Sequence, residues 1–145
     1  MPATGVDVWD KTLQTTNIWL DEIMERMGPD RHTAWHALGA VLRALRDRLP
    51  LELAAHLGAQ LPLLVRGTYY DQWHVGGQTG LPRTLDDFFA VVELNLGNTR
   101  PMSSAEATAA VFRTLSNHVD RGQIRKVVAA LPAPLRDFWL DCEAG

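Results

Sequence analysis

The side chains best suited to chemistry lie between Arg66 and His74, near the middle of the chain. Polar-tipped aromatic rings beside a glycine-rich loop can line a ligand site or a partner surface. The candidate ligand-binding or partner-binding residues are Arg66, Tyr69, Tyr70, Asp71, Trp73 and His74. The alternative, which we favour, is that they cap a helical bundle and seat the loop that follows.

Other reactive groups are sparse. His32 and His36 are four residues apart, so they could share a helix face and hold a metal ion. A metal site needs a third ligand, and no HExxH motif is present, so the two histidines are weak candidates. The loop HVGGQTGLP lacks the Lys-Ser/Thr pair of a phosphate-binding loop, and Cys142 has no histidine close by in sequence. We predict no catalytic residue, no metal site and no cofactor, and we expect a protein that is not an enzyme.

The elements that must position these residues are helices. Trp19, Ile23 and Met27 recur at steps of four residues and form one apolar stripe, which ends at Gly28-Pro29. Asp30 is placed to cap the next helix. Pro62 is expected to be the first residue of a short fourth helix, where its missing N–H costs nothing. No segment has the sustained alternation of a strand, so the predicted fold class is all-α.

An internal repeat organises the helices. A shift of 70 residues places residues 33–71 on residues 103–141 without a gap, and a shift of 69 places NIWLDEIMERMG on DDFFAVVELNLG. The chain is therefore predicted to be a helical bundle of two tandem pseudo-equivalent four-helix units. They span residues 8–71 and 84–141 of one domain, residues 1–145. The linker, residues 72–83, precedes Thr84, a predicted N-cap.

The repeat also serves as an internal control for the candidate residues. Arg66 and Arg136 occupy matching positions, and so do Arg43 and Arg113. An arginine required twice is expected to hydrogen-bond helix-end carbonyls or a carboxylate on a neighbouring helix, rather than a substrate. The aromatic residues from Tyr69 to Trp73 differ between the two units, so any chemistry is expected there. Whether the loop Gly76–Pro82 has a function is left open.

Composition excludes several classes of protein. The chain has 145 residues, 46% of them hydrophobic and 21% charged, with a net charge of −3, as in ordinary soluble domains. No Lys/Arg cluster marks a nucleic-acid binder. No apolar run approaches the roughly 20 residues that span a bilayer. The first residues lack the pattern of a signal peptide, and the single Cys142 excludes an internal disulfide. We expect a soluble, cytoplasmic protein without nucleic-acid or membrane partners.

The central run LRALRDRLPLELAAHLGAQLPLLVRGTYYDQW is similar to the hallmark of a bacterial family, domain of unknown function 2267. Trp19-Leu20 and the closing LPAPLRDFW match its flanking motifs, so the resemblance covers about Val8 to Trp139. It implies the fold and a soluble bacterial origin, but no catalytic residue. The expected function is a non-catalytic binding or interaction module, with a protein partner or self-association. The alternative is a small-molecule-binding protein or enzyme with its site around Arg66–His74.

Overall fold

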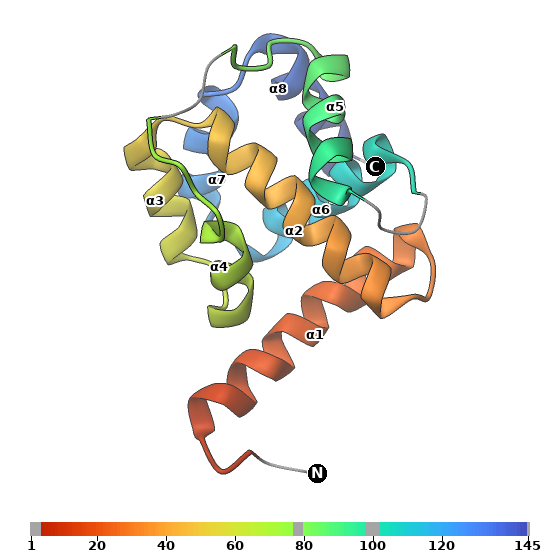
Figure 1. Cartoon of the computed structure of the whole chain (residues 1–145), viewed down its shortest axis with the longest axis vertical. Coiled ribbons are helices and arrows are strands. Elements are labelled where there is room, and N and C mark those ends of the chain that lie inside the picture. Colours follow the sequence, from red (N-terminus) through yellow and green to blue (C-terminus); the bar gives the residue numbers. More distant parts are fainter. Residues whose placement is uncertain (1–3, 77–79, 98–101, 145) are drawn as a thin grey trace.

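The computed structural model describes residues 4–76, 80–97 and 102–144. In these ranges the chain forms eight α-helices and no strand, which confirms the predicted all-α class (Figure 1). The helices are α1 Asp7–Met27, α2 Arg31–Arg48, α3 Leu51–Ala59, α4 Leu63–Tyr70, α5 Leu85–Leu96, α6 Ser104–His118, α7 Arg121–Ala129 and α8 Ala133–Ala144. None of the helices described is both long and apolar enough to span a membrane.

Local chemistry sets the helix ends. The Asp30 carboxylate accepts hydrogen bonds from the backbone N–H groups of His32 and Thr33, and the Thr84 hydroxyl accepts one from Asp87. Both predicted N-caps are thereby confirmed. α1 ends at Gly28, whose φ of 105° suits a residue without a side chain.

The prediction for Pro62 was wrong by one residue. Leu63 is the first residue of α4, and Pro62 precedes it with φ −55° and ψ 150°. This extended ψ keeps Pro62 outside the helix, although its carbonyl accepts the first helical bond, from the Arg66 N–H. Pro132 likewise lies immediately before Ala133, the first residue of α8.

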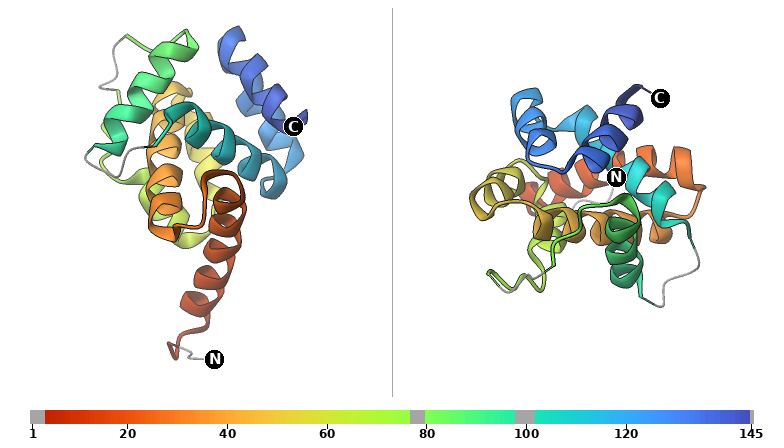
Figure 2. Two further views of the ribbon diagram at one scale, coloured as in Figure 1. Left: turned by 90° about the vertical axis from the view of Figure 1, so that its right-hand side faces the viewer. Right: turned by 90° about the horizontal axis from the view of Figure 1, so that it is seen from above.

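α2 lies at the centre of the molecule and contacts α1, α4, α5 and α6 (Figures 1 and 2). α1 packs on α6, and α5 packs on α2. The buried side chains form one cluster that draws on all eight helices. The ring of Phe112 stacks on that of Trp139 at 4.0 Å between centroids, which ties α6 to α8. This core gives every helix a fixed position relative to α2.

The helix boundaries recur along the chain. α3 and α4 begin at Leu51 and Leu63, and α7 and α8 begin seventy residues later, at Arg121 and Ala133. This is the spacing that the repeat requires. The duplication itself stays a prediction, to be tested by superposing residues 33–71 on 103–141.

The N-terminal half of α1 extends away from the rest of the molecule (Figures 1 and 2). We call residues 7–15 the arm. Val8 and Trp9 on the arm are each 54% exposed, and Leu13 is 44% exposed. Beside the arm lies the start of α4, whose Leu64 N–H donates to the Thr12 hydroxyl at 3.2 Å. The apolar surface of α1 therefore continues beyond the part that the core covers.

Candidate functional site

Arg66 connects α4 to the end of α3. Its guanidinium donates hydrogen bonds to the carbonyl oxygens of Gly58, Ala59 and Leu61, at 3.0, 3.2 and 2.9 Å. Arg136, seventy residues on, donates in the same way to the Leu131 carbonyl at 3.0 Å. Carbonyls at a helix C-terminus have no intrahelical partner, and a cation is favoured there by the helix dipole. The geometry thus agrees with the structural role expected for both arginines.

The two tyrosines also turn their hydroxyl groups toward α3. Tyr69 is fully buried and donates to the Ala54 carbonyl at 2.6 Å, and Tyr70 donates to the Ala55 carbonyl at 3.2 Å. Burial raises the pKa of Tyr69 well above its ordinary value, so its hydroxyl stays protonated. The Tyr70 ring stacks on Trp73 at 5.5 Å between centroids. These aromatic residues join α3, α4 and the chain that follows into one unit.

Arg46 on α2 binds the end of α4 and thereby holds this cluster in place. The sequence analysis did not identify it. Only 4% of its surface is exposed. Its guanidinium donates to the carbonyls of Tyr69 and Asp71 at 2.9 and 2.8 Å, and to the Asp47 carboxylate at 2.8 Å. It also lies 5.8 Å from the centre of the Trp73 ring, within range of a cation–π contact. The sequence does contain one indication that Arg46 is buried. It follows Leu42 by four residues and so falls on the apolar face of α2.

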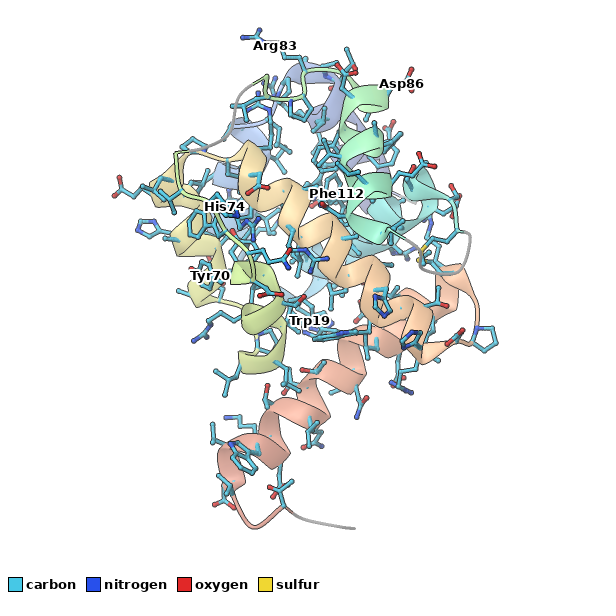
Figure 3. The ribbon with its side chains drawn as sticks, viewed as in Figure 1. Trp19, Tyr70, His74, Arg83, Asp86 and Phe112 are labelled. Carbon is cyan, nitrogen blue, oxygen red and sulfur yellow. The ribbon has the colours of Figure 1, made fainter. Side chains whose placement is uncertain are left out.

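The remaining candidates lie at the edge of the cluster. Asp71 and His74 are exposed, and Figure 3 places His74 on the same side of the molecule as Tyr70. A cavity of about 230 Å³ lies next to Trp73, between Arg46 and the residues after α2. The structure therefore brings Tyr69, Tyr70 and Trp73 together, but it uses the hydroxyl groups of the two tyrosines and the guanidinium of Arg66 in hydrogen bonds within the chain. It assembles no nucleophile with an adjacent general base there.

His32 and His36 on α2 contact each other. The rings of His32 and His36 meet edge to face at 4.4 Å between centroids. Burial, followed by the charges of His32 and Arg43, lowers the pKa of His36. Across the described ranges, no group of three or more His, Cys, Asp or Glu side chains is arranged to hold a metal ion. The pair is thus a ring contact at the start of α2.

Cys142 is a buried thiol on α8, 7% exposed. Burial raises its pKa to about 11, so the thiol is protonated at neutral pH. A protonated, buried thiol is a poor nucleophile. Cys142 is instead one of the buried side chains of the core.

Comparison with known proteins identifies a family and no activity. No curated protein matches the chain. One family model, described as an uncharacterized conserved protein, matches residues 16–138. The matched range contains the whole Arg66–His74 cluster and leaves the arm outside. Because it covers most of the 145 residues, the chain belongs to the family of domain of unknown function 2267 (DUF2267).

Proposed function

We propose that the protein is a non-catalytic cytoplasmic binding module that pairs with a second copy of itself through the arm. The exposed apolar surface of the arm is the observation that carries this proposal. It comprises Val8, Trp9 and Leu13 on α1 and the neighbouring Leu63 and Leu64 on α4, each at least 40% exposed. Isolated exposed apolar residues are ordinary, but a group of this kind on a projecting helix is typical of an interaction surface.

The sequence of α1 explains why the surface is left uncovered. Trp9, Leu13, Thr16, Leu20, Ile23 and Met27 follow one another at alternating steps of four and three residues. Side chains at these steps lie on one side of a helix. The core buries Thr16, Leu20 and Ile23, whereas Trp9 and Leu13 lie beyond it. The helix thus carries a longer contact face than its own chain fills.

A groove beside the arm provides the surface that would accept the arm of a second copy. It has a volume of about 320 Å³ and lies between the arm and the turn from α3 to α4, with Val8, Leu61, Pro62 and Leu63 in its lining. This space suits an indole ring. Two copies related by a twofold axis would each place Trp9 in the groove of the other, which is the reciprocal contact of an isologous dimer.

Charge favours the same arrangement. The arm begins with Asp7 and Asp10, while Lys11 and Arg66 line the groove. An antiparallel crossing of two arms brings the acidic start of one toward the basic groove of the other. Opposite charges at the rim of an interface direct its orientation and its rate of association.

The alternative function, small-molecule binding or catalysis around Arg66–His74, has less support. Arg66, Tyr69 and Tyr70 already donate their hydrogen bonds to carbonyls of α3 and of the turn after it. A ligand there would have to replace these bonds. Asp71 and His74 are not part of the lining of the cavity beside Trp73.

Sedimentation of the purified chain over a range of concentrations tests the dimer. The native chain should sediment as a dimer, and the double variant Trp9→Ala/Leu13→Ala should be a monomer with an unchanged far-ultraviolet circular dichroism spectrum, which shows that it stays folded. Ile18→Ala is the matched control, because Ile18 is 48% exposed on another face of α1, and this variant should still dimerise. A native monomer, or a dimer that survives the double change, would contradict the proposal.

A charge exchange tests the orientation. Lys11→Glu should weaken the dimer, and Asp7→Lys/Asp10→Lys in the same chain should restore part of the loss. No restoration would mean that the acidic start of the arm does not meet the groove.

A further inference from the structure

A second groove, between α1 and α6, carries a set of charges that the dimer proposal does not use. Its volume is about 400 Å³, within the range of small-ligand sites. α1 contributes Glu22, Glu25 and Arg26 to its lining, and α6 contributes Arg113 and Asn117. The buried Ala110 and Thr114 also line it. We call it the α1–α6 groove.

Two of these charged side chains already have partners. Glu22 contacts the His118 ring at 2.5 Å and accepts a hydrogen bond from Asn117 at 3.2 Å. Arg26 donates to Glu106 at 3.2 Å. Neither Glu25 nor Arg113 has a hydrogen bond or an ion pair with any residue in the described ranges. One carboxylate on α1 and one guanidinium on α6 therefore remain available.

Comparison with the first half of the chain explains why Arg113 is available. Arg43, seventy residues earlier, donates to the Thr68 hydroxyl at 2.9 Å. The residue seventy positions after Thr68 is Phe138, whose ring offers no comparable acceptor. Arg113 has thus lost the intramolecular partner that its counterpart keeps.

The α1 wall of the groove also differs from its counterpart, α5, because it carries charged residues where α5 carries apolar ones. At a shift of 69 residues, Glu22 and Glu25 correspond to Val91 and Leu94 on α5. In that half Asn95, which corresponds to Arg26, donates to the Ala40 carbonyl at 3.1 Å and closes α5 onto α2. The α1–α6 groove therefore has carboxylates on its α1 wall opposite Arg113 on α6, whereas α5 carries valine and leucine at the positions equivalent to Glu22 and Glu25.

We infer that the α1–α6 groove binds a zwitterion the size of an amino acid or a dipeptide, with its ammonium group at Glu25 and its carboxylate at Arg113. A guanidinium forms two parallel hydrogen bonds with a carboxylate, and a carboxylate accepts the N–H groups of an ammonium ion. The lining holds two carboxylates and two guanidiniums, so the groove favours a ligand without net charge over a polyanion. The groove is distinct from the arm, so this inference does not depend on the dimer.

Calorimetric titration of the full chain with the twenty free L-amino acids and with glycylglycine tests the inference. At least one probe should bind once per chain with a Kd of about 1 mM or lower. Its N-acetylated and C-amidated forms should each bind at least about tenfold more weakly, because each lacks one of the two charges. If no probe binds, or if the capped forms bind equally well, the inference is overturned.

Matched variants then locate the site. Glu25→Gln and Arg113→Gln should each weaken binding of that probe by about tenfold or more. The controls are Glu52→Gln and Arg125→Gln, exposed residues of α3 and α7, and they should leave the Kd unchanged. Glu25 and Arg113 are exposed, so all four variants should keep the native melting temperature. Binding that survives both groove changes would place the probe elsewhere and overturn the assignment. Repeating the titration in Trp9→Ala/Leu13→Ala separates failure of the groove from failure of the dimer.

Discussion

The hydroxyl oxygen of Tyr70 lies only 2.2 Å from the position that a Cβ atom on Gly58 would occupy. The Cε2 atom of Tyr69 lies 3.0 Å from the same point. α3 and α4 therefore approach so closely that residue 58 must lack a side chain. The glycine lies inside α3, where it weakens the helix by itself, so its position is explained by the two tyrosine rings packed against it.

Replacing Gly58 with alanine should destabilise the protein by about 1–3 kcal/mol, because the clash outweighs the gain in helix propensity. Gly67 is the matched control. It lies in α4, and no other part of the chain comes within 4 Å of the point where a methyl group on it would lie, so Gly67→Ala should stabilise by about 0.5–1 kcal/mol. Urea unfolding of both variants measures the difference. Equal stability of Gly58→Ala and the native chain would contradict the close contact of α3 with α4.

Replacing Arg46 with methionine should lower the free energy of unfolding by about 2 kcal/mol or more. Methionine fills much of the space but leaves the carbonyls of Tyr69 and Asp71 without a donor in a buried setting. Arg125→Met on the exposed face of α7 should change stability by less than about 0.5 kcal/mol. The near-ultraviolet circular dichroism of Trp73 should weaken in Arg46→Met alone. Similar effects from both changes would mean that Arg46 does not organise the end of α4.

Leu61 and Leu131 precede the matching prolines, and they are 1% and 2% exposed. Leu61→Ala and Leu131→Ala should each cost about 2–5 kcal/mol, as expected when a buried leucine leaves a cavity. Leu140→Ala on α8, which is 48% exposed and lies outside the proposed dimer surface, is the control and should cost far less. Thermal unfolding measures all three. A loss below about 0.5 kcal/mol from either buried leucine would conflict with its place in the core.

Cys142 should make stability depend on pH in the alkaline range. Its folded-state pKa is raised to about 11, mainly by burial, from an ordinary value of 9.0. The unfolded chain therefore loses the thiol proton first, and the stabilising contribution, complete below about pH 9, disappears as pH rises through 11. Urea midpoints between pH 7 and 11 should fall less steeply in Cys142→Ala than in the native chain.

The rate of alkylation gives a second measure of the same thiol. Native Cys142 should react with iodoacetamide far more slowly at pH 8 than the urea-unfolded chain does. Equal rates would show that the thiol is accessible and ionises normally, contrary to its burial.

The sequence predicted the features that depend on near neighbours. Helical stripes, the caps at Asp30 and Thr84, and the end of α1 at Gly28 all follow from side chains a few residues apart. Pro62 was misplaced by one position because its fixed φ is compatible both with the first helical residue and with the residue before it. ψ decides between the two, and sequence does not restrict it.

The candidate sites could be predicted only in part. Arg66 and Arg43, which recur as Arg136 and Arg113, were both expected to hydrogen-bond helix-end carbonyls or a carboxylate on a neighbouring helix. Arg66 does so, whereas Arg43 donates to the Thr68 hydroxyl. The burial of Arg46 depends on the packing of α2 against α4, which involves residues more than twenty positions away. The α1–α6 groove joins Glu25 to Arg113 across nearly ninety residues, so no local pattern connects them. Surfaces formed by distant helices require the fold.

The arm is only about two helical turns long beyond the body of the protein, and so short a helix is marginal by its own hydrogen bonds. Its end should therefore open and close repeatedly while the remaining helices stay folded. In a solitary molecule the backbone amides near Lys11 would exchange rapidly with deuterium, and trypsin would cut there. Docking against a second molecule would suppress both reactions. The rate of exchange at the end of the arm would therefore measure the fraction of chains that are paired.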